Sequence, residues 1–246
     1  MTGSTASWLA FTLYVAGLLA AFGARTIAHL IKTGSSGFKG VSGRPGSLSW
    51  WGGVLFVVAL LLGLLAVVLA VMGADRGPDA FAHSIAVGAG TALTVGGLVV
   101  TLAAQSAMGT SWRIGVDDAE RTALVETGLF RWVRNPVFTG MTMVSAGVAL
   151  LVPTVAAALS LLTLVIAIQL QVRVTEEPYL RRVHGTAYAD YRQRTGRFIP
   201  RSADNVRGVG LSPPQPGGPT PTHPGAHSLS PTTPNGQSIS QHTERP

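Results

Sequence analysis

The chain has 246 residues, of which 47% are hydrophobic and only 12% are charged. A soluble domain carries about 25% charged residues, so this composition excludes an ordinary soluble protein and indicates an integral membrane protein. There is no cysteine, which excludes disulfides, thiolate nucleophiles and thiolate metal sites.

Five apolar segments are predicted to cross the membrane, because each approaches the roughly 20 residues that a spanning helix needs. The last two are shorter and are separated only by Pro153, which fits a tight turn between antiparallel helices. No positive charge precedes Trp8, so the first segment is predicted to be a retained helix and not a cleaved signal peptide. The five segments are Trp8–Ile31, Trp51–Ala74, Phe81–Met108, Val137–Val152 and Thr154–Val174.

The net charge of +7 is distributed over loops and flanks, so it predicts contact with membrane lipids and no nucleic-acid partner. Basic residues gather after the first, third and fifth segments, whereas the loop after the second carries only Arg76. The positive-inside rule therefore places the amino end outside and the carboxyl end in the cytoplasm. Sixteen of the 18 basic residues are arginine, which suggests a GC-rich bacterial genome and hence a bacterial inner membrane.

The chain is predicted to have three parts: spanning helices in 1–107, a core in 108–200 that carries the site-like polar residues, and a tail in 201–246. The tail contains nine prolines among Ser, Thr, Gly, Gln and His. Such a segment buries too little apolar surface to offset its ordering entropy, so it is predicted to be disordered. His223 and His227 lie in this tail with no helix to hold them, and no metal site is predicted.

The motif Arg134-Asn135-Pro136 begins the fourth apolar segment. Proline is favourable in the first turn of a helix and Asn135 is a suitable cap, so one interpretation is a capped helix with an arginine at the membrane surface. The other is an anion site, because a helix amino end presents a positive dipole to a carboxylate. Both interpretations stay open at this point.

Two adjacent acids, Glu176 and Glu177, lie where the fifth apolar segment is expected to end. Carboxylates at a helix carboxyl end oppose the helix dipole and repel one another, so a cation is expected nearby. Arg173 has suitable i,i+3 and i,i+4 spacing. A cationic ligand is the alternative.

An amphipathic helix is predicted after these acids, because four ring-bearing or apolar residues recur at helical spacing among basic ones. We expect this helix to lie on the cytoplasmic leaflet, whether or not it also lines a site. His184, taken alone, is interpreted as structural. The four residues are Leu180, His184, Tyr188 and Tyr191.

Together these motifs resemble the isoprenylcysteine carboxyl methyltransferase family, which is itself similar to the phospholipid methyltransferases. The resemblance covers about residues 108–200. The matching residues are Leu124-Val125, Gly128, Phe130, Arg134-Asn135-Pro136, Phe138, Gly140, Glu176-Glu177, Leu180, Gly185, Tyr188, Tyr191 and Phe198-Ile199-Pro200.

The resemblance implies an S-adenosylmethionine-dependent methyltransferase that releases S-adenosylhomocysteine, with a cofactor pocket closed by the last helical hairpin. Arg134 and Arg173 are implied to hold an anionic acceptor, and Glu177 or His184 would be the candidate base for an amine acceptor. The implied cofactor contacts are Thr122, Ala123, Leu124, Val125, Phe130, Asn135, Pro136, Val137, Phe138 and Glu176.

Asn135, Phe130 and Phe138 replace a histidine and two tyrosines that are common in eukaryotic members, and Arg173 is displaced by one position from the expected arginine. The predicted function is methyl transfer to a carboxylate, or another nucleophile, of a hydrophobic or membrane-associated acceptor. The alternatives are methylation of a phospholipid amine and a non-catalytic membrane protein of the same fold that binds a lipid or a partner.

Overall fold

The computed structural model describes residues 3–36, 40–74, 84–109 and 123–201, and the regular structure in these ranges is helical. They contain one isolated bridge, between Val133 and Gly196, and no strand. The predicted disordered tail beyond residue 201 lies outside the described residues. The elements are α1 (Gly3–Leu18), η1 (Leu19–Ala24), α2 (Arg25–Thr33), α3 (Leu48–Val71), α4 (Ser84–Met108), η4 (Gly128–Arg131), α5 (Pro136–Leu151), α6 (Val155–Leu170), η5 (Gln171–Glu176) and α7 (Glu177–Arg194).

The prediction of an all-α membrane protein is confirmed, with four helical stretches long and apolar enough to span a bilayer. The fourth predicted span is shorter than the others: α5 has 16 residues, about 24 Å of helix against a hydrocarbon core of about 30 Å. The four long stretches are Thr5–Thr33, Leu48–Val71, Ile85–Met108 and Val155–Arg194.

Small residues face the protein interior and large aliphatic residues face outward, as expected when lipid is the solvent. Along α3, Ala59, Gly63 and Ala66 are buried whereas Leu61 and Leu65 are exposed. This arrangement lets neighbouring backbones approach closely. It also explains why hydropathy along α3 carries almost no amphipathic signal.

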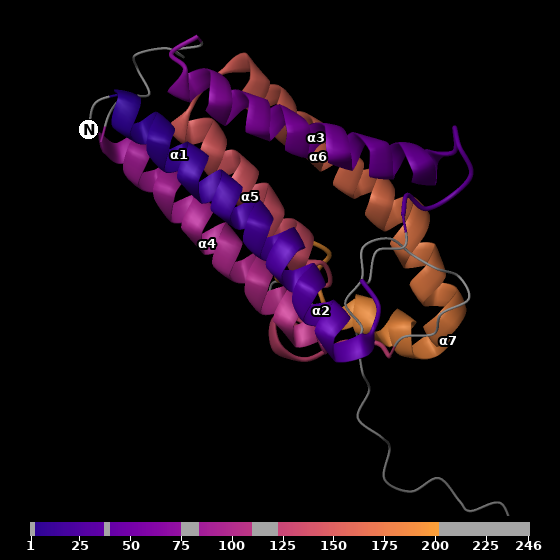
Figure 1. Cartoon of the computed structure of the whole chain (residues 1–246). Helices are drawn as coiled ribbons and strands as arrows, with labels where there is room; N and C mark the ends of the chain where they lie inside the picture. Colours follow the sequence, from indigo (N-terminus) through magenta and orange to yellow (C-terminus); the bar gives the residue numbers. More distant parts are fainter. Residues whose placement is uncertain (1–2, 37–39, 75–83, 110–122, 202–246) are drawn as a thin grey trace, which may run out of the picture. The chain divides into compact units, whose positions relative to one another are not determined.

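The helices that pack most extensively are α4 with α5 and α3 with α6, and α3 and α6 lie side by side in Figure 1. The α4–α5 contact repeats every seven residues, with Gly90 and Gly97 on α4 facing Gly147 and Gly140 on α5. A Cβ atom added to Gly97 would lie 2.6 Å from the carbonyl oxygen of Gly140. Glycine is therefore required for this contact.

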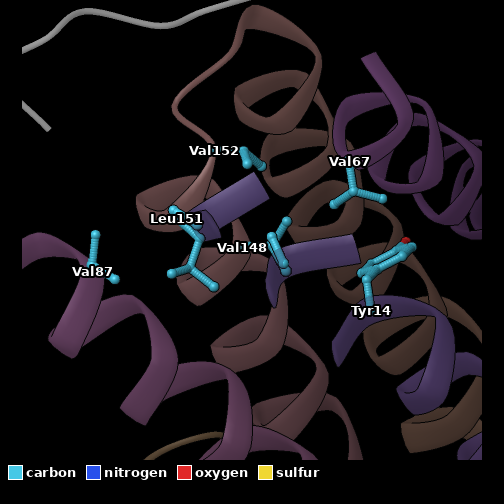
Figure 2. Close-up of a cluster of buried hydrophobic side chains, with 8 residues drawn as sticks. Tyr14, Val67, Val87, Val148, Leu151 and Val152 are labelled. Atoms are coloured by element: carbon cyan, nitrogen blue, oxygen red, sulfur yellow. The ribbon is translucent and has the colours of Figure 1, made fainter. Parts of the chain in front are cut away.

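A cluster of buried side chains packs together the start of α1, the end of α3, the start of α4 and the end of α5 (Figure 2). Tyr14 of α1 lies in this cluster with Val67 of α3 and Val148 of α5, and the Tyr14 hydroxyl donates to the Leu60 carbonyl oxygen at 2.8 Å. This hydrogen bond satisfies a polar group within an apolar region. The cluster fixes α1 to both helix pairs.

The expected helix end at Glu176 and Glu177 is wrong, because α6 continues through the π-helical turn η5 directly into α7. Glu177 has helical backbone angles (φ −62°, ψ −42°) and begins α7. The two acids therefore do not oppose the dipole of a terminating helix. The wider turn of η5 changes the direction of the side chains that follow it, and Gly185 (φ 50°, ψ −120°) kinks α7 farther on.

We expect Gly97→Ala to lower the free energy of unfolding by about 1–3 kcal/mol, because the added methyl group collides with α5 backbone. Gly88→Ala is the matched control on α4, since an added Cβ meets nothing within 4 Å there. Both changes gain the same helix propensity. Unfolding by SDS in mixed micelles measures the difference, and equal stability of the two variants would contradict the close α4–α5 contact.

Candidate functional site

A cavity of about 310 Å³ lies where the polar motifs meet the N-terminal helices. This volume lies at the lower end of the range for small-molecule sites. Two walls form it, one from the segments that carry the motifs and one from η1, α3, α4 and residues 40–42. The motif wall contains Ala123, Leu124, Val125, Phe130, Arg134, Asn135, Pro136, Val137, Phe138, Met141, Gln171, Glu176, Glu177, Tyr179, Leu180, Tyr188 and Tyr191.

Eleven of the thirteen residues predicted for the site from sequence lie on this wall. Of the other two, Thr122 falls outside the described residues. Arg173 is not on the wall: its side chain is exposed, and its Nε donates to Gln169 Oε1 at 2.8 Å. The structure thus brings segments about 40 residues apart in sequence, 123–138 and 176–191, around one cavity.

The segment before α5 is fixed by backbone pairing with residues 196–197. The backbone amide of Arg134 donates to the Gly196 carbonyl oxygen at 2.8 Å. The backbone amide of Asn135 donates to the Arg197 carbonyl oxygen at 3.1 Å. Asn135 occupies the cap position of α5, but its side chain makes no capping bond. Its Nδ2 instead donates to the Arg197 carbonyl oxygen at 3.0 Å, so the proposed cap is replaced by a link between the two segments.

Glu177 is paired with three arginines. Its side chain is only 6% exposed, and Arg197 donates to both carboxylate oxygens, at 2.8 and 3.0 Å. Arg134 Nη1 lies 3.4 Å from the same carboxylate and Arg181 Nη2 lies 3.7 Å away. The hydrogen bond to Glu177 raises the pKa of Arg197 above its usual value, so this guanidinium stays charged.

Arg134 is placed between this ion-pair cluster and the cavity. Its side chain is 10% exposed, and its Nε and Nη1 have no hydrogen-bond partner among the described residues. A guanidinium has five donors, and leaving donors buried without partners costs free energy. Arg134 therefore has hydrogen-bonding capacity available for an anionic or carbonyl oxygen.

Aromatic residues of α7 form part of the motif wall. The Tyr191 hydroxyl donates to the Phe130 carbonyl oxygen at 2.6 Å, and the Tyr188 and Tyr191 rings lie 6.3 Å apart. Both tyrosines are almost fully buried. The predicted amphipathic helix thus directs its aromatic side chains toward the cavity.

Sequence reasoning did not identify the second wall, which contains Phe22, Gly40, Val41, Ser42, Gly53, Phe56, Val57, Gln105 and Met108. Phe56 connects the two walls, because its ring makes edge contacts with Phe22 and with Phe138, both at 6.4 Å between centroids. Hydrophobicity marks most of these residues as apolar but does not distinguish a side chain that lines a cavity from one that faces lipid.

We expect Arg197→Met to lower the free energy of unfolding by about 3 kcal/mol, because it removes the bidentate partner of a buried carboxylate. Arg181 is another partner of this carboxylate, but its side chain is 53% exposed. Arg181→Met should therefore lower the free energy of unfolding by less than about 1 kcal/mol. Unfolding in detergent compares the two. Equal losses of unfolding free energy in the two variants would show that the Glu177–Arg197 pair stabilises the fold no more than the exposed Glu177–Arg181 pair.

The sequence profile described as "Phospholipid methyltransferase" matches residues 85–187. No curated protein and no solved structure matches the chain significantly. The matched segment contains α4, α5, α6 and most of α7, and so includes nearly all of the motif wall. The resemblance to the isoprenylcysteine carboxyl methyltransferase and phospholipid methyltransferase family is therefore confirmed for this region, and the match supports a membrane methyltransferase of that kind.

Proposed function

We propose that the protein transfers a methyl group from S-adenosylmethionine to a hydrophobic or membrane-associated acceptor in the cavity between the two walls. The observation that carries this proposal is the convergence of 123–138 and 176–191 on one cavity with both charged and apolar surfaces. The match to a methyltransferase family over the same residues supports it.

The residues of the motif wall fit the chemical groups of S-adenosylmethionine. Glu176 offers a carboxylate to a positive group of the cofactor. Phe130 and Phe138 offer apolar faces to an adenosine ring, and the backbone of 123–125 offers polar groups beside them. We assign cofactor binding to these residues together with Asn135, Pro136 and Val137.

When bound, S-adenosylmethionine supplies an electrophilic methyl group on a sulfonium. The protein has to align a nucleophile with that group and exclude water. Arg134 is suited to orient a carboxylate, because a guanidinium makes directional, charge-assisted hydrogen bonds. Arg173 is exposed outside the cavity, and we do not assign it a role in orienting the acceptor.

The surroundings of the candidate bases favour an acceptor that needs no general base. Glu177 lines the cavity but is paired with Arg197, Arg134 and Arg181, which stabilise its ionised form and make it a weak base. His184 is not on the cavity wall. A carboxylate acceptor loses no proton on methylation, so carboxyl methylation agrees best with this arrangement.

Methylation of a phospholipid amine is the second candidate, and the description of the matched family favours it. This reaction must release a proton, and Glu177 or His184 would be required to accept it. A non-catalytic lipid- or partner-binding role is the third candidate, and it requires no cofactor affinity.

We assign the protein to a bacterial inner membrane with its amino end outside. Arg134, Arg181, Arg194 and Arg197 all lie at the end of the bundle that holds the cavity. The positive-inside rule places such an end in the cytoplasm, where a hydrophilic cofactor is available. An apolar acceptor would come from the bilayer.

We expect purified protein to bind S-adenosylhomocysteine in calorimetry, and Glu176→Gln to weaken binding about tenfold or more through loss of a charge-assisted contact. Glu126→Gln is the matched control, because Glu126 pairs with Arg194 and does not line the cavity. Equal affinity of both variants would remove Glu176 from the cofactor site.

We expect His184→Gln to leave methyl transfer into a bacterial lipid extract unchanged, because His184 lies off the cavity wall. Radiolabelled S-adenosylmethionine provides the measurement, and mild alkali then releases methanol from a methyl ester but not from a methylated amine. Alkali-stable label together with loss of turnover in His184→Gln would establish amine methylation instead.

A further inference from the structure

Gln105 is a buried polar residue on the wall formed by the N-terminal helices. It lies one turn before the end of α4, is 3% exposed and borders the cavity beside Phe22, Phe56 and Met108. A buried amide among apolar side chains is costly unless its donors and acceptor are satisfied.

The orientation of this amide follows from the hydrogen bond that its side chain makes with η1. Gln105 Nε2 donates to the Ala21 carbonyl oxygen in η1 at 3.1 Å. A carbonyl oxygen only accepts, so the NH2 group has to face Ala21 and the opposite orientation would place two acceptors together. Oε1 is therefore directed away from Ala21, and it has no hydrogen-bond partner among the described residues.

An unsatisfied acceptor selects a ligand group with an N–H or O–H. The charged surface of the cavity is on the opposite wall, where Arg134 and Glu176 lie. Phe22, Phe56 and Met108, which line the cavity with Gln105, are apolar and suit the body of a hydrophobic molecule, whereas Arg25 donates to the backbone carbonyl oxygen of Gln105 at 2.8 Å. This part of the N-terminal wall thus combines apolar side chains with the fixed acceptor Oε1 of Gln105.

On the basis of the proposed function, we propose that Gln105 is a specificity-determining residue for the methyl acceptor. Its Oε1 accepts a hydrogen bond from an N–H or O–H group on an otherwise apolar acceptor molecule. Sites that present a buried hydrogen-bonding group reject analogues that lack the partner, because the protein group is then left unpaired.

Two isomeric probes test this proposal: 1-dodecanol, which has an O–H donor, and 1-methoxyundecane, which has none. Each is titrated into protein in lipid nanodiscs, with and without S-adenosylhomocysteine, and its affinity is obtained from the rise of the unfolding midpoint. We expect wild type to bind 1-dodecanol about tenfold more tightly than its isomer. Gln105→Met should bind the two equally.

The ratio of the two probe affinities is independent of the structural effect of Gln105→Met, because loss of the hydrogen bond to Ala21 changes the affinity for both probes alike. Gln169→Met is the matched control, since the Gln169 amide pairs with Arg173 outside the cavity, and this variant should keep the preference. An equal affinity of wild type for both probes, or a preserved preference in Gln105→Met, would overturn the proposal.

Calorimetry with S-adenosylhomocysteine separates this proposal from the function on which it rests. Unchanged cofactor affinity in Gln105→Met supports a contact with the methyl acceptor. A large loss of cofactor affinity would place the donor on the cofactor and overturn the assignment. Absence of cofactor binding in wild type would reject the proposed function, whereas the probe preference is measured independently of it.

Discussion

The site depends on the pairing of the buried Glu177 carboxylate with arginines from two other segments. Arg197 follows α7, and Arg134 precedes α5. The same two segments are joined by the backbone bonds from Arg134 to Gly196 and from Asn135 to Arg197. Because a buried carboxylate is stable only with such partners, α7 and the start of α5 are held at a fixed separation, and the motif wall of the cavity results.

The two walls of the cavity differ in polarity. The wall from 123–138 and 171–191 carries the charged groups, whereas the wall from η1, α3 and α4 is apolar apart from Gln105 and Ser42. Most of the apolar wall precedes residue 85, where the family match begins. In the proposed function the motif wall serves the cofactor, and the opposite wall, which includes Gln105 of α4, determines which acceptor fits.

Much of the fold could be predicted because long apolar segments have few stable conformations in a bilayer other than helices. The motif residues of the site could also be predicted, since their order and spacing resemble a family. The continuation of α6 through η5 into α7 could not be predicted, because a π-turn has no clear sequence signal and the end of the apolar segment suggested a helix end. Arg197 was missed as the partner of Glu177 because they are 20 residues apart, beyond any helical spacing.

In the proposed function, residues 123–138 and 176–191 together bind S-adenosylmethionine. Hydrogen exchange measured by mass spectrometry, with and without S-adenosylhomocysteine in nanodiscs, tests it directly. We expect slower exchange in both segments at the same ligand concentration, with no change in the α3 segment 60–71, which does not line the cavity. Unchanged exchange in both segments, or protection confined to another part of the protein, would contradict it.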